Sequence, residues 1–109
     1  MNNLPNGVRW LKDENFSGEP SCDDENNEDI IFGLAMGDIG IFIIRRDYLR
    51  RTNLWVLDYV DSYIENTLGQ DFNDWNWVRV DDEIDFMGLI DLAITEANGL
   101  VSSLCKQNH

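Results

Sequence analysis

The sequence is poor in histidine, cysteine and positive charge. Its one histidine, His109, is the last of 109 residues, and its two cysteines are Cys22 and Cys105. Chain ends are usually mobile, so His109 is a poor general base and a Ser-His-Asp or Cys-His site is not expected. With no secretion signal at the N-terminus, the two cysteines are expected to be free thiols.

Motifs for phosphate, metal and redox chemistry are also missing. The sequence has no GxxxxGK[ST], no GxGxxG after a strand and no CxxC, and the acidic run 23–29 lacks the glycine and final glutamate of a calcium-binding loop. No apolar run reaches the roughly 20 residues of a membrane-spanning helix. We therefore expect a cytoplasmic protein that uses no cofactor or metal and contacts no membrane.

Acidic residues far outnumber basic ones. Twenty-one Asp and Glu stand against eight Lys and Arg, which gives a formal net charge of -13. This charge opposes direct binding to nucleic acid and favours a basic protein as partner. The alternative is that the acidic surface serves only solubility.

The length and the hydrophobic content predict one folded domain, residues 1–109. Hydrophobic residues make up 43% of the chain and include four Trp, five Phe and three Tyr, which is enough for a core despite the charge.

A β-hairpin at 29–46 is the expected centre of the fold. Gly37-Asp38 separates two apolar runs rich in β-branched residues, which is typical of a hairpin turn. The apolar residues are consecutive, so both faces of the hairpin should be covered. The alternative is a buried helix, in which Gly33, Gly37 and Gly40 would each cost about 1 kcal/mol relative to alanine.

The remaining elements are expected to pack around this hairpin. Val56, Leu57, Val60 and Ile64 recur at helical spacing within 53–68, and a second helix should follow a cap at Asp81 or Asp82. Together these patterns predict an α+β fold in which a small, mostly antiparallel sheet packs with two helices. The expected elements are a strand at 8–11, an acidic surface loop at about 12–28, the hairpin at 29–46, a helix at about 53–68, a strand at 75–80 and a helix at about 82–105.

Acidic and aromatic residues form the candidate partner-binding site. Acids surround two tryptophans of the strand at 75–80, and a second acidic cluster precedes the hairpin. Such a surface could clamp a basic cleft by charge and aromatic anchoring. The alternative is that the tryptophans are core residues and the acids cap helices. The candidate residues are Asp71, Asp74, Trp75, Trp77, Asp81, Asp82, Glu83 and Asp85, with Asp23, Asp24, Glu25 and Glu28.

Four arginines, Arg45, Arg46, Arg50 and Arg51, follow the hairpin. They could neutralise the acidic loop within the molecule or bind an external phosphate. Because a hairpin brings its ends together, the first interpretation predicts that carboxylates from Asp23–Asp29 lie near Arg45 and Arg46.

Three functional hypotheses follow from these residues. The leading one is a non-enzymatic, acidic inhibitor of a basic partner, specifically an immunity protein that neutralises a nuclease toxin. The first alternative is a nucleic-acid mimic that inhibits a host defence enzyme, of the anti-restriction or anti-CRISPR type. The second is a metal-assisted hydrolase that uses Asp58, Asp61 and Glu65, placed on one face of the expected helix at 53–68.

Overall fold

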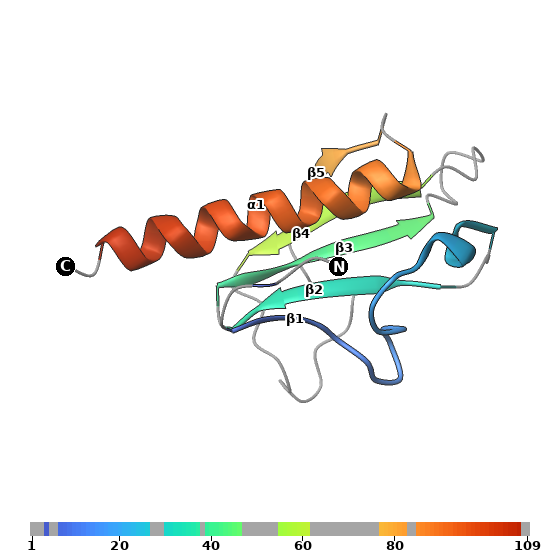
Figure 1. Cartoon of the computed structure of the whole chain (residues 1–109), viewed down its shortest axis with the longest axis horizontal. Helices are drawn as coiled ribbons and strands as arrows, with labels where there is room; N and C mark the ends of the chain where they lie inside the picture. Colours follow the sequence, from blue (N-terminus) through green and yellow to red (C-terminus); the bar gives the residue numbers. More distant parts are fainter. Residues whose placement is uncertain are drawn as a thin grey trace.

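A computed structural model describes residues 4, 7–26, 30–37, 39–46, 55–61, 77–82 and 85–107. Its strands form one five-stranded antiparallel sheet in the order β1-β2-β3-β4-β5, and a single α-helix is present in the described part of the chain (Figure 1). The elements are β1 (Val8–Trp10), the 3-10 helix η1 (Cys22–Asn26), β2 (Phe32–Met36), β3 (Gly40–Arg46), β4 (Trp55–Asp61), β5 (Trp77–Asp81) and α1 (Phe86–Gln107). The α+β class and the antiparallel sheet are confirmed, whereas the second expected helix is not.

The expected hairpin is confirmed as β2 and β3. Phe32 lies opposite Ile44, and every residue of β2 is buried, so both faces of this strand are covered as its continuous apolar sequence predicts. Gly37 adopts a φ of 58°, which is favourable for glycine, and the Ile39 amide donates to the Met36 carbonyl at 3.0 Å. Asp38, the other expected turn residue, lies outside the described residues.

The prediction of a helix at 53–68 is wrong for residues 55–61, because they form strand β4. Residues 62–68 lie outside the described part. Along β4, Trp55 and Leu57 pack in the core on the helix side of the sheet, while Val60 packs in a second core on the opposite side. A strand that is buried on both faces carries neighbouring apolar residues. The pair Val56-Leu57 therefore resembles the apolar face of a helix, and this caused the error.

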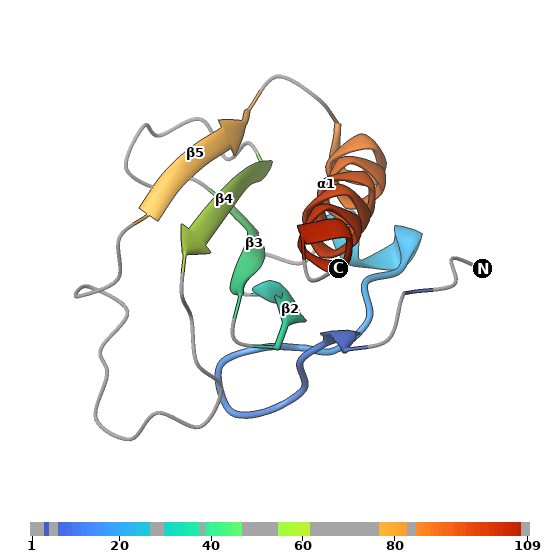
Figure 2. The same ribbon diagram turned by 90° about the vertical axis from the view of Figure 1, so that its left-hand side faces the viewer.

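The helix α1 covers one face of the sheet, over β2, β3 and β4 (Figures 1 and 2). It was expected to begin at a cap formed by Asp81 or Asp82, but Asp81 ends β5 and the helix begins at Phe86. Asp85 provides the cap, since its Oδ1 accepts from the Gly88 amide at 2.7 Å. The buried face of the helix consists of Phe86, Leu89, Ile90, Ala93 and Ala97.

Part of the expected surface loop covers the opposite face of the sheet. Leu11 and Phe16 are 1% and 2% exposed and pack with Ala35, Ile41, Ile43 and Val60. The segment is tied to β2 because the Leu11 amide donates to the Gly33 carbonyl at 2.8 Å and the Ser17 amide to the Ile31 carbonyl at 3.0 Å. The sequence around Phe16 is polar, so this contribution to the core was not expected.

Two glycine substitutions test this packing in opposite directions. A Cβ on Gly33 would lie 2.8 Å from the Phe16 ring and 2.9 Å from Ile41 Cδ1, whereas one on Gly99 in α1 would meet nothing within 4 Å. Gly33→Ala should lower the free energy of unfolding by about 1–3 kcal/mol through overpacking. Gly99→Ala should raise it by about 0.8 kcal/mol through helix propensity. Urea unfolding measures both, and a Gly33→Ala protein as stable as the wild type would contradict this position of Phe16.

Candidate functional site

The acidic-aromatic segment predicted from the sequence is described in part. Trp77 and Asp81 are the ends of β5, Asp82 follows directly, and Asp85 caps α1. Asp71, Asp74, Trp75 and Glu83 lie outside the described residues. The described members therefore belong to the end of one strand and the start of the helix that follows it.

The second acidic cluster forms η1, which is attached to the sheet through its backbone. The Glu25 carbonyl accepts from Arg46 Nη2 at 2.6 Å and from Trp55 Nε1 at 3.0 Å. The Arg46 guanidinium also lies over the Trp55 ring, 5.0 Å from its centroid. Because a carbonyl makes these two contacts, η1 is held in place while Asp23 and Glu25 remain exposed. Glu28 lies outside the described residues.

The fold brings both described acidic groups to the same end of the sheet. Arg46 at the end of β3 lies opposite Trp55 at the start of β4, and Asp81 at the end of β5 lies opposite Leu57. The start of α1 lies at this end too, since the centroid of the Phe86 ring is 4.5 Å from that of the Trp55 ring. Figure 1 shows η1 and the start of α1 at this end. We call this end, with its six described acids, the acidic end: Asp23, Asp24, Glu25, Asp81, Asp82 and Asp85.

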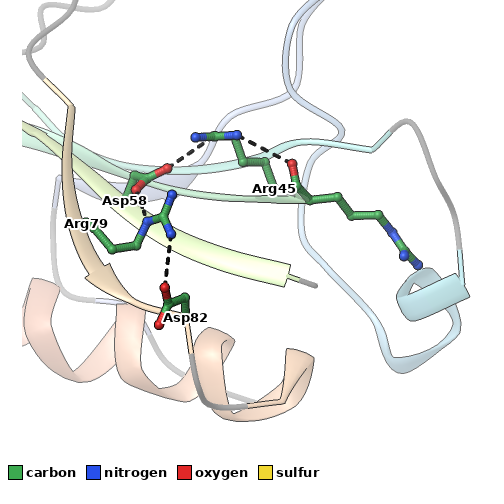
Figure 3. A network of polar contacts seen from close by, with 5 residues as sticks. Arg45, Asp58, Arg79 and Asp82 are labelled. Carbon is green, nitrogen blue, oxygen red and sulfur yellow. Dashed lines mark hydrogen bonds and ion pairs between the residues drawn. The ribbon is translucent and has the colours of Figure 1, made fainter. Parts of the chain in front are cut away.

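A buried carboxylate was missed by the sequence reasoning. Asp58 in β4 is 2% exposed, and its two oxygens accept from different arginines: Oδ2 from Arg45 Nε at 3.1 Å and Oδ1 from Arg79 Nε at 2.7 Å (Figure 3). Arg79 Nη1 also contacts Asp82 Oδ2 at 3.3 Å. These four residues, the Asp58 network, connect the three strands β3, β4 and β5 and carry no net charge. The available signal was a single acid between two apolar pairs, Val56-Leu57 and Tyr59-Val60, but Asp58 was assigned to the exposed side of a helix.

Trp77 belongs to the same side of the sheet as the Asp58 network. It is partly buried, packs against the core formed around Phe16, and lies beneath Arg45, whose guanidinium carbon is 5.3 Å from the Trp77 ring centroid. Arg79 lies on this side too, since it binds Asp58. The packing favours a structural contribution from Trp77, and its part in partner binding stays a prediction.

Carboxylates of Asp23–Asp29 were predicted to lie near Arg45 and Arg46, and the described contacts of these arginines are of another kind. Arg46 reaches η1 through the Glu25 carbonyl, whereas Arg45 pairs with Asp58. Neither contact uses a carboxylate of the Asp23–Asp29 run. Arg50 and Arg51 lie outside the described residues, as do Asp29 and Glu28.

The geometry assumed for the hydrolase alternative is wrong. Asp58 and Asp61 belong to strand β4 and not to the helix face on which this hypothesis placed them. Both Asp58 oxygens are bound by arginines, and no group of three or more potential metal-ligating side chains occurs within the described ranges. Glu65 lies outside them.

Comparison with known proteins gives no relative. No family model, curated protein or solved structure matches this chain. In the described part of the chain, no helix combines the length and the apolar character needed to cross a membrane.

The Asp58 network can be tested by removing its central charge. Asp58→Asn keeps the shape of the side chain but leaves two guanidinium groups without the carboxylate that separates them. The free energy of unfolding should fall by about 3 kcal/mol, which is the lower limit of the usual cost of breaking a buried ion pair. The lower limit applies because both arginines are partly exposed.

Asp82→Asn is the matched control, since it removes the same charge from a contact in which both side chains are 30% exposed. It should cost less than about 1 kcal/mol. Urea unfolding measures both variants, and equal stabilities for the two would show that Asp58 is not the centre of the network.

Proposed function

We propose that the protein is an acidic inhibitor that binds one basic partner, specifically an immunity protein that neutralises a nuclease toxin. The observation that carries this proposal is the gathering of six acids from two distant parts of the chain at one structured end of the sheet. A nuclease cleft must be positive to hold nucleic acid, so a fixed acidic surface is complementary to it.

The internal pairing of arginines supports the proposal. Arg45 and Arg79 are balanced within the Asp58 network, and Arg46 is bound to the backbone of η1 and to the Trp55 ring. Arg79 also pairs with Asp82, one of the six acids, so the support comes from the other acids gathered at this end of the sheet. The net charge of -13 adds a long-range attraction for a basic partner, which speeds association at low salt.

The rigid attachment of the acids is a second support. Asp24 Oδ2 accepts from the Ser21 amide at 2.9 Å, and the Asp85 side chain caps α1, so these acids are fixed by local hydrogen bonds. A binding surface that is already ordered loses less conformational entropy when the complex forms. The acidic end thus suits a tight, stoichiometric inhibitor.

A binding screen against purified, basic nuclease toxin domains tests the proposal. We expect the protein to form a one-to-one complex with at least one domain, to block its cleavage of nucleic acid, and to associate more slowly as salt is added. A folded protein that binds none of the domains would contradict the proposal. Specific binding to a restriction or CRISPR enzyme in a parallel assay would favour the nucleic-acid mimic instead.

Charge-matched variants locate the surface. Asp23→Asn with Glu25→Gln, and separately Asp81→Asn with Asp85→Asn, each remove two charges from the acidic end; asparagine keeps the capping ability at position 85. Each pair should slow association at least several-fold in low salt.

The control pair is Asp91→Asn with Glu96→Gln, which removes two charges from exposed positions of α1. This pair should change the association rate much less, because its charges lie further along the helix. Equal effects from all three pairs, measured by stopped-flow fluorescence, would indicate that only the overall charge matters and not the acidic end.

A further inference from the structure

The edge strand β5 presents an apolar side chain to solvent beside the acidic end. Val78 is 51% exposed, although it lies opposite Tyr59, which is partly buried against the helix-side core. Val80 is also partly buried against that core, although the pairing of β4 with β5 shifts register beside it, between Leu57 and Asp58. The apolar side chains of the core therefore continue onto the surface along β5.

The position of the helix explains this exposure. α1 packs over β2, β3 and β4, and β5 extends beyond it, as the end-on view shows (Figure 2). The outer strand of the described sheet thus has its helix-side face only partly covered. A single exposed valine is common on protein surfaces, so its significance depends on what surrounds it.

Acidic residues border this apolar face on the side toward the helix. Asp81 follows Val80 directly in the chain and Asp85 caps α1, while Asp82 between them pairs with Arg79. An apolar centre with a charged rim is the usual composition of a protein-protein interface. The sign of the rim fits a partner that carries Lys or Arg around an apolar side chain.

We propose that Val78, Val80 and Tyr59 form the apolar centre of a docking surface for a basic nuclease domain, with Asp81 and Asp85 as its acidic rim. This inference rests on the proposed function and names where the partner sits. The rim attracts the basic surface and orients it, while Val78 is covered by an apolar side chain of the partner. Burial of that contact slows dissociation, whereas the rim charges act on association.

Val78→Arg tests this surface. The substitution places a long, positive side chain at the proposed centre, where it clashes with the partner and repels it. Val78 is half exposed, so the fold should tolerate the change, and thermal unfolding checks this. A milder variant, Val78→Thr, keeps the β-branched shape and strand propensity but removes apolar surface.

Ser103→Arg is the matched control. It adds the same positive charge at an exposed position of α1, roughly 27 Å along the helix axis from Asp85. Each variant is measured by surface plasmon resonance against the nuclease domain that the wild-type protein binds. We expect Val78→Arg to raise the dissociation constant at least about tenfold, Val78→Thr to raise the dissociation rate several-fold, and Ser103→Arg to change neither appreciably.

The outcomes separate this inference from the proposed function. Wild-type affinity in the folded Val78→Arg protein would overturn the docking surface while leaving the inhibitor intact, and so would equal losses for Val78→Arg and Ser103→Arg. If the wild-type protein binds no nuclease domain of the panel, both proposals fall. A loss confined to the two Val78 variants would support the docking surface.

Discussion

Burial of the Asp58 carboxylate between Arg45 and Arg79 is the interaction on which the rest of the structure depends. A charge that is 2% exposed is costly unless opposite charges and hydrogen bonds satisfy it, and here each oxygen has its own guanidinium donor. The two arginines come from the strands on either side, so the register of β3, β4 and β5 is tied to one side chain. A slip by one residue would turn Asp58 to the helix-side core, away from both partners.

The same network decides how charge is distributed on the molecule. It holds two of the eight basic residues in a neutral group, while backbone and ring contacts occupy Arg46. The rings of Phe32, Trp55 and Phe86 pack at the end of the sheet where β3 and β5 finish and α1 begins. Acids from η1 and from the β5–α1 connection are thereby gathered around an aromatic core. Ordered backbone and a concentration of acidic residues occur together there, which suits an inhibitor of a basic enzyme.

The sequence predicts an element correctly where its apolar residues follow the repeat of either a helix or a strand. The prediction fails where both repeats fit. The hairpin was predicted because glycine and β-branched residues favour strands over a helix, and α1 because its apolar residues follow a helical repeat over 22 residues. A helix was wrongly predicted for β4, because a strand that is buried on both faces has consecutive apolar residues. This error also hid the candidate site: only a strand at 55–61 brings Asp81 beside β4 and unites the two acidic clusters. Phe16 could not be predicted, since a single aromatic residue in a polar loop has no periodicity.

The central claim is that an ordered acidic end neutralises a basic nuclease, and survival of cells tests it most directly. Each nuclease domain is expressed in bacteria with the wild-type protein, or with a variant in which Asp23, Glu25, Asp81 and Asp85 are replaced by their amides. The account predicts that the wild-type protein restores colony formation against at least one nuclease and that the variant, folded and equally abundant, does not. Failure of the folded wild-type protein to protect against any of them, or equal protection by the variant, would contradict it.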